Sequence, residues 1–184
     1  MKIVVIVGHP NADSFCEALA LAYARGAKAM GHEVDVINLR DLQFDPVSEK
    51  GFDLRQPLDS KTFKAVGQIG RAEHSVWIWP VLLGARPALL QGFVERLFQS
   101  DAIRRDQGFT ARKSARIIVT LPDLSWLERL FVPWMVTWGF SRQFLRIAGF
   151  TRVRRCGYPC MNRVGGERRD VWLSEVERLG RRAV

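Results

Sequence analysis

The stretch that decides the fold is IVVIVGHPNADSF, residues 3–15. Its first part, Ile3–Val7, is a run of β-branched aliphatic residues, which is typical of a strand covered on both faces. Beyond the turn, Ser14–Met30 places apolar side chains at helical spacing, and Gly31 is a signal for the helix end. The stretch therefore predicts a buried strand, a short loop and a helix, in that order.

The same alternation continues along the chain. Short apolar runs rich in β-branched residues predict further strands at Val34–Ile37, Val76–Trp79, Ile117–Leu121 and Arg152–Cys156. Helical spacing and end signals predict further helices at Pro87–Phe98, from the capping box Ser125–Glu128 onward, and at Glu167–Arg181. Residues 41–60 are expected to form a long surface loop. This alternation favours one open parallel sheet with right-handed crossovers and helices on both faces.

The loop after the first strand distinguishes two kinds of doubly wound sheet. A dinucleotide-binding fold would carry G-x-G-x-x-G there, but this chain has only Gly8, followed by His-Pro-Asn. Five βα units with a ligand crevice at the carboxyl ends of the strands favour a flavodoxin-like α/β fold. We expect a three-layer sandwich with a five-stranded parallel sheet of order 2-1-3-4-5, and a single flavodoxin-like domain spanning residues 1–184.

Composition and charge narrow the classes of function. Hydrophobic residues are 47% and charged residues 26%, which excludes wholesale disorder. The net charge is +9, and residues 141–184 alone hold 11 basic and 4 acidic residues. Solvated surface is the default for these arginines. The functional alternatives are recognition of the 2′-phosphate of NADPH, peripheral contact with an anionic membrane, and nucleic-acid binding. Nucleic acid is disfavoured because the sequence carries no helix-turn-helix, RNP or zinc motif.

The cysteines and the hydropathy pattern point to a cytoplasmic protein without a metal. Cys16, Cys156 and Cys160 are an odd number, which suggests reduced thiols rather than a disulfide framework. Cys156 and Cys160 have poor spacing for zinc and no histidine nearby. The apolar run at the start is too short for a signal peptide, and no run reaches the roughly 18 residues of a spanning helix.

The loop from Gly8 to Phe15 is a candidate phosphate site. A helix N-terminus offers unpaired N–H groups and a partial positive charge. The His9 ring and the Ser14 hydroxyl can add donors, whereas Asp13 is expected to point away from a phosphate. Two interpretations of Ser14 remain open, because with Glu17 three residues later it also forms a capping box. His32 and His74 lie at predicted strand starts and need no special role.

Three sequence segments carry a resemblance to a known family. They are GHPxxxSF at residues 8–15, WPVLLGARPALLQGFVERLF at residues 79–98 and LQFDP at residues 42–46. Together they resemble the NAD(P)H:quinone oxidoreductase family with a flavodoxin-like fold. That family includes the mammalian quinone reductases and the ancillary oxidoreductases of bacterial potassium-efflux systems. The resemblance covers most of the chain in order.

The resemblance implies a flavin-dependent NAD(P)H oxidoreductase that gives two-electron reduction of a quinone or similar acceptor. The implied cofactor-binding residues are His9, Ser14 and Phe15 at the phosphates, Pro80, Val81, Leu82, Leu83 and Gly84 along the isoalloxazine, and Thr120 at its pyrimidine edge. No catalytic side chain is expected, because the flavin itself accepts and gives the hydride. The cofactor is expected to be FAD or FMN, with FAD slightly favoured, and NAD(P)H is the expected electron donor.

Two departures from the family pattern keep an alternative open. Val81-Leu82-Leu83 replaces a turn that usually carries aromatic residues, and Leu121-Pro122 replaces two glycines. Pro122 has no N–H to offer a flavin ring. The alternative is a flavin-poor, non-catalytic flavodoxin-like partner or regulatory protein.

An aromatic segment, Trp126–Phe140, is relevant to whether the protein forms a dimer. It is too rich in large rings for one helix face on one sheet, although some of these residues must be buried. The segment follows the fourth strand, where members of the resembled family line the substrate pocket and the dimer contact. We therefore expect a homodimer with a bulky apolar acceptor pocket built partly from these rings.

Overall fold

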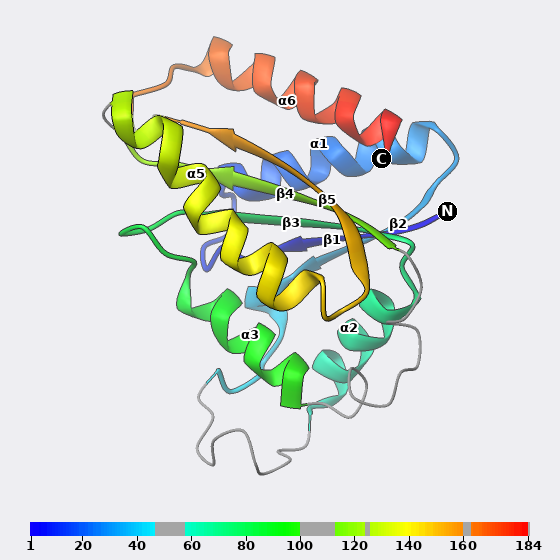
Figure 1. The fold of residues 1–184 in the computed structure, drawn as a ribbon. Helices are drawn as coiled ribbons and strands as arrows, with labels where there is room; N and C mark the ends of the chain where they lie inside the picture. The colour runs from blue at the N-terminus through cyan, green and yellow to red at the C-terminus, as the bar shows by residue number, and fades with distance from the viewer. Residues whose placement is uncertain (47–57, 100–112, 124–125, 160–162, 184) are drawn as a thin grey trace.

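One parallel sheet runs through the computed structural model, which describes residues 1–46, 58–99, 113–123, 126–159 and 163–183 (Figure 1). Its strands are β1 (Lys2–Val7), β2 (Glu33–Asn38), β3 (His74–Pro80), β4 (Lys113–Thr120) and β5 (Phe150–Tyr158). The sheet order is β2-β1-β3-β4-β5, and every neighbouring pair is parallel. The predicted flavodoxin-like order 2-1-3-4-5 is confirmed.

Helices cover both faces of this sheet, as predicted (Figure 1). On one face lie α1 (Phe15–Ala29) and α6 (Gly166–Arg182), and on the other lie α2 (Ser60–Arg71), α3 (Ala88–Gln99) and α5 (Trp126–Phe140). Two short turns complete the described elements, a 3-10 turn η1 (Leu39–Asp41) and a π-helical turn η2 (Ser141–Leu145). In the described part of the chain, no helix is both long and apolar enough to cross a bilayer.

The central strands divide their side chains between two hydrophobic cores. In β1, Val4 and Ile6 face α2, α3 and α5, whereas Ile3, Val5 and Val7 face α1 and α6. All five side chains are almost completely buried. Because successive side chains of a strand point to opposite faces, a strand covered twice must be apolar at every position. This is the physical origin of the unbroken aliphatic run in the sequence.

Several element boundaries differ from the sequence predictions. Helix α2 was not predicted, because SKTFKAVGQIGR is polar and contains two glycines. The Asp59 carboxylate caps this helix by accepting from the Lys61 and Thr62 N–H groups.

The starts of three other elements also differ from the predictions. Pro87 precedes α3 instead of opening it, since its carbonyl accepts from the Gln91 N–H. Strands β4 and β5 begin earlier than expected, because ladder hydrogen bonds continue past the apolar run. Ser125 and most of the predicted 41–60 loop lie outside the described residues.

Helices α1 and α6 approach backbone to backbone at two glycines. A Cβ on Gly26 would overlap the carbonyl oxygen of Glu177, and a Cβ on Gly180 would overlap the carbonyl oxygen of Tyr23. Neither obstacle is a side-chain tip that can swing away. The two glycines therefore set the separation of these helices.

A buried polar trio ties α1 to the sheet. The His74 ring lies between the Tyr23 hydroxyl, 3.0 Å from Nε2, and the Ser114 hydroxyl, 2.7 Å from Nδ1. His74 is fully buried. Burial, reinforced by the nearby charges of Arg116 and Arg154, lowers the pKa of His74 to about 4.

Replacing either close-approach glycine should destabilise the fold. Alanine is intrinsically the better helix former by about 1 kcal/mol. Nevertheless, Gly26→Ala and Gly180→Ala should each lower the free energy of unfolding by about 1–3 kcal/mol, because the helices must move apart. Gly67→Ala on α2 is the matched control, since its Cβ would meet only the flexible Arg71 side chain, and it should be neutral or stabilising. Denaturant titrations in which all three variants behave alike would contradict this account.

His74 should make the protein acid-sensitive. Its pKa is about 4 in the folded state against 6.5 for the unperturbed group, so between these values only the unfolded state takes up the proton. The free energy of unfolding should therefore fall as the pH is lowered through this window. His74→Gln removes the titrating group while the carboxylates remain, so its stability curve should be flatter there. Parallel curves for the two proteins would disprove the assignment.

Candidate functional site

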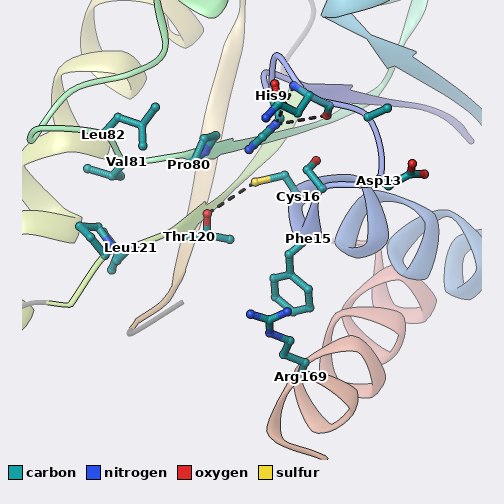
Figure 2. Close-up of a pocket in the computed structure, with 14 residues that line it drawn as sticks. His9, Asp13, Phe15, Cys16, Pro80, Val81, Leu82, Thr120, Leu121 and Arg169 are labelled. Atoms are coloured by element: carbon teal, nitrogen blue, oxygen red, sulfur yellow. Dashed lines mark hydrogen bonds between the residues drawn. The ribbon is translucent and has the colours of Figure 1, made fainter. Parts of the chain in front are cut away.

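A pocket of about 480 Å³ opens at the carboxyl edge of the sheet (Figure 2). Its walls are the β1–α1 loop, the ends of β3 and β4, and one side chain from α6. Since the carboxyl ends of parallel strands meet at one edge, residues far apart in sequence converge there. The volume lies within the range of about 300–1,000 Å³ that is usual for small-molecule sites.

Most of the predicted cofactor residues line this pocket. These are His9, Ser14, Phe15, Pro80, Val81, Leu82 and Thr120. Leu83 and Gly84 instead form the tip of the turn after β3, where Leu83 is fully exposed. Leu82 and Ala85 exchange two backbone hydrogen bonds, at 3.0 and 2.9 Å, and the two residues between them have φ of +49° and +74°. The turn is thus tight, and its tip lies beyond the residues that line the pocket.

Ser14 caps α1 and still has a donor to offer. Its Oγ accepts from the Glu17 N–H at 3.3 Å, so the predicted cap is present. The cap uses the hydroxyl oxygen as an acceptor and leaves the hydroxyl proton for another partner. The N–H groups of Phe15 and Cys16 lie in the first helical turn, where N–H groups have no acceptor within the helix. Capping and ligand binding by Ser14 are therefore compatible.

The hydrogen bonding of His9 engages one side of its ring. The Asn11 N–H donates to His9 Nδ1 at 3.0 Å, and the Asn11 carbonyl oxygen lies 3.2 Å from the same nitrogen. The loop backbone therefore occupies Nδ1 and leaves Nε2 for a ligand. His9 is half-buried and lines the pocket, so Nε2 is the ring atom that can contact a ligand there.

Phe15 connects the loop to α6. Its ring packs against Trp172, with centroids 6.2 Å apart, and the Arg169 guanidinium lies 5.7 Å from the centroid of the same ring. Arg169 lines the pocket (Figure 2). The sequence suggested only that some arginine of the basic last quarter lies near the site. It carried no signal that would single out Arg169.

The floor of the pocket joins α1 to β4. Thr120 Oγ1 lies 3.5 Å from Cys16 Sγ, and both side chains are buried. Burial raises the pKa of Cys16 to about 11, so the thiol stays protonated at neutral pH. Sequence reasoning did not assign Cys16 to the site. Its position directly after Phe15, in the first turn of the helix, was the available signal.

The remaining walls are mostly apolar. Pro80, Val81 and Leu82 line one side, and Leu121 and Pro122 line another. Val81 donates its N–H to the Thr120 carbonyl at 2.8 Å, which holds the two walls together. Among the described residues, no three His, Cys, Asp or Glu side chains are grouped so as to hold a metal ion. The pocket thus combines a polar end at the start of α1 with apolar walls, an arrangement suited to a phosphate-bearing planar cofactor.

Several solved structures share this architecture over nearly the whole chain. Smu.1420 from Streptococcus mutans UA159 is 22% identical, with a TM-score of 0.78 over 99% of this chain and 100% of that one. An NAD(P)H:quinone oxidoreductase from Methanothermobacter marburgensis is 20% identical, with a TM-score of 0.78 over 97% of this chain and 94% of that one. An FMN-dependent NADH-azoreductase from Bacillus anthracis str. Ames Ancestor, in complex with FMN, is 12% identical, with a TM-score of 0.69 over 100% of this chain and 99% of that one.

At such identities the likeness establishes the fold. Sequence comparison with curated proteins finds no match. A family model described as flavodoxin-like fold matches residues 1–155, from β1 into β5, and leaves α6 outside the matched region. The predicted preference for FAD gains no support, since FMN is the flavin named for the structurally similar azoreductase. The matched residues, the sheet order and the pocket at the carboxyl edge together show that this chain belongs to the flavodoxin-like fold family.

Proposed function

We propose that this protein is a flavin-dependent NAD(P)H oxidoreductase that holds FMN in the pocket at the carboxyl edge of the sheet. Its proposed acceptor is a quinone or a similar small molecule. The observation that carries the proposal is the convergence of the α1 N-terminus, the Ser14 hydroxyl and the His9 ring on a pocket whose other walls are mostly apolar. The similar structures named for quinone and azo reduction support the same chemistry.

The polar end of the pocket suits a phosphate. Backbone N–H groups of the first α1 turn and the Ser14 hydroxyl supply donors without a lysine, and His9 would donate from Nε2. The helix dipole adds favourable potential for an anion at this end. Arg169 contributes the cationic side chain at the pocket wall. These groups would bind the ribityl phosphate and leave the ring to the apolar walls.

The apolar end suits a flat ring. Pro80, Val81 and Leu82 would lie along one face, with Leu121 beside them, so aliphatic packing takes the place of aromatic stacking. Thr120 would offer its hydroxyl to a polar edge of the ring. The flavin, when bound, supplies the hydride chemistry, and the protein binds, orients and excludes water. None of these tasks needs a side chain that gains or loses a proton, so we propose no catalytic side chain.

Oligomerisation is proposed from the exposed face of α5. Phe131, Trp134, Met135 and Trp138 recur at helical spacing, and their exposed fractions are 64%, 56%, 60% and 41%. Phe140, from the same predicted cluster, is fully buried against Trp77 and Trp79. The aromatic segment is thus divided between core and surface. Four large apolar side chains on one exposed helix face favour contact with a second copy of the chain.

Purified protein should carry or take up FMN and show the visible absorption band of oxidised flavin. Ser14→Ala should weaken FMN binding about tenfold, because it removes a hydrogen bond to a charged group. Ser14→Asp keeps a good helix cap but places a carboxylate at the phosphate, so it should lose more affinity with little loss of stability. Ser174→Ala, on the exposed side of α6, is the control.

These outcomes separate the two functions under consideration. A colourless wild-type protein that fails to take up added FMN or FAD would reject the enzyme and favour the flavin-poor partner protein. FMN release on denaturation, together with NAD(P)H-dependent bleaching of the bound flavin, would support the enzyme.

Charge on the exposed α5 face should dissociate the proposed homodimer. Trp134→Glu and Trp138→Glu would each bury a carboxylate at the contact, which is unfavourable without a partner charge. Sedimentation should show a dimer for the wild type and a monomer for the double variant. Phe63→Glu, at a 67% exposed position on α2, is the control and should stay dimeric. A monomeric wild type at micromolar concentration would refute the proposal.

A further inference from the structure

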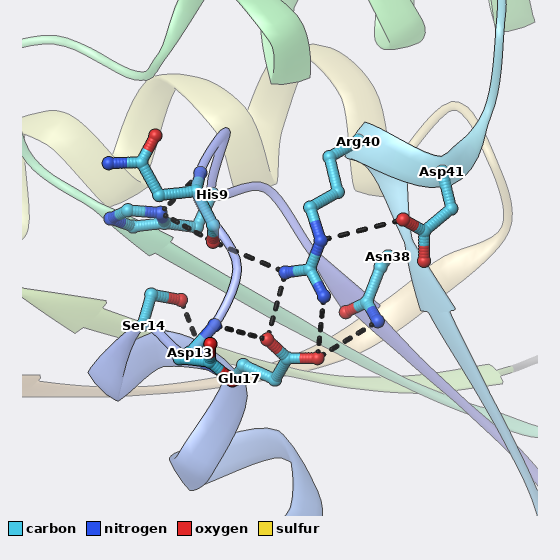
Figure 3. A network of polar contacts seen from close by, with 8 residues as sticks. His9, Asp13, Ser14, Glu17, Asn38, Arg40 and Asp41 are labelled. Atoms are coloured by element: carbon cyan, nitrogen blue, oxygen red, sulfur yellow. Dashed lines mark hydrogen bonds and ion pairs between the residues drawn. The ribbon is translucent and has the colours of Figure 1, made fainter.

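Behind the pocket, a carboxylate ties three segments of the chain together (Figure 3). Glu17 lies in the first turn of α1, Arg40 lies in η1 just after β2, and both contact the loop between β1 and α1. The Glu17 and Arg40 side chains are only 18% and 19% exposed. We call this group, formed by Glu17, Asn38, Arg40 and the loop atoms that they hold, the Glu17 clamp.

The Glu17 carboxylate accepts four hydrogen bonds in the clamp. Arg40 donates from Nη1 to Oε2 and from Nη2 to Oε1, both at 2.8 Å. Asn38 Nδ2 donates to Oε1 at 3.2 Å, and the Asp13 N–H donates to Oε2 at 3.1 Å. A carboxylate has about four such acceptor positions, so all are filled. The hydrogen bonds from Arg40 also hold the pKa of Glu17 below its usual value.

Arg40 has a second contact with the loop. Its Nη1 also donates to the Asn11 carbonyl at 3.2 Å, and its Nε lies 3.4 Å from a carboxylate oxygen of Asp41. Arg40 is not among the residues that line the pocket. The guanidinium therefore holds the loop from behind, and its donors are directed at protein groups rather than at the site.

These contacts fix an otherwise unfavourable loop. Asp13 has a φ of +52°, a region that residues with a side chain seldom adopt, and its N–H is held by Glu17. Asn11 is held at both ends, by Arg40 through its carbonyl and by His9 Nδ1 through its N–H. The Asn11 peptide also holds the His9 ring through Nδ1, and Asp13 directly precedes the capping residue Ser14. The loop shape thus depends on the clamp.

We propose that Glu17 and Arg40 are positioning residues that preset the His9–Ser14 loop for the phosphate of FMN without touching it. The inference rests on the proposed function, since it names residues that act on the same site. Groups ordered during folding need not be ordered again on binding, and this raises affinity. Because the paired charges of Glu17 and Arg40 compensate each other, the clamp acts through geometry rather than attraction.

Two variants separate geometry from attraction. Glu17→Gln removes a negative charge near the phosphate, and Arg40→Lys keeps the positive charge but loses the two-pronged contact. If electrostatic attraction decided binding, Glu17→Gln would raise the affinity for FMN and Arg40→Lys would leave that affinity unchanged. If the two residues act by positioning the loop, both variants should lower the affinity for FMN, by about tenfold for a lost charged hydrogen bond. Riboflavin lacks the phosphate, so the affinity of either variant for riboflavin should fall by less than about twofold relative to the wild type.

The measurement is fluorescence titration of flavin-free protein with FMN and with riboflavin, alongside thermal unfolding of each variant. Arg25→Lys is the matched control, because Arg25 lies on α1 and pairs with Glu177 on the side away from the loop. If Arg40→Lys does not fold, the nearly isosteric Glu17→Gln decides. Wild-type FMN affinity in both variants, or an equal loss for riboflavin, would overturn the positioning role. A wild type that binds no FMN would instead overturn the proposed function.

Discussion

Strand β1 is hydrogen-bonded to a parallel neighbour on each side, and the other elements follow from that constraint. Val5 pairs with Val36 of β2 and with Val76 of β3, so the backbone of β1 is paired along both edges. Parallel neighbours need crossover connections, and the crossover helices cover both faces of the sheet. The chain leaves β1, β3 and β4 at the same edge, which is where the pocket forms. Burial of the strand and location of the site are thus two consequences of one pairing pattern.

In the part of the chain that the structure describes, few of the basic residues that give the protein its net charge lie at the pocket. The basic last quarter is spread over β5 and α6, where most of its arginines are exposed. Some arginines complement local acids, as Arg181 does with Glu177. Arg169 differs, because it reaches the pocket beside Phe15. A large net charge on a chain therefore says little about a site until the fold selects which charges face it.

Much of the fold was predictable because its signals are local. The aliphatic run of β1, the Ser14 cap and Gly31, with its φ of +76°, each express a preference of a few neighbouring residues. Helix α2 was missed because most of its stability comes from Ala65, Val66 and Ile69 packing on the sheet rather than from its own propensity. The ends of β4 and β5 were missed because strand pairing, not side-chain polarity, determines where a ladder stops.

For the site, the sequence by itself determined the strand, loop and helix that carry His9, Ser14 and Phe15, since adjacent residues dictate those conformations. The resemblance to the quinone reductase family, rather than local preference, pointed to the apolar turn after β3 and to Thr120 at the end of β4. Only the tertiary structure decided that Cys16 meets Thr120, that Arg169 lines the pocket, and that Arg40 holds the loop from behind. It also decided which rings of α5 are buried and which are exposed. The contacts at the pocket join residues far apart in the chain, and they form because the parallel sheet brings the carboxyl ends of its strands to one edge.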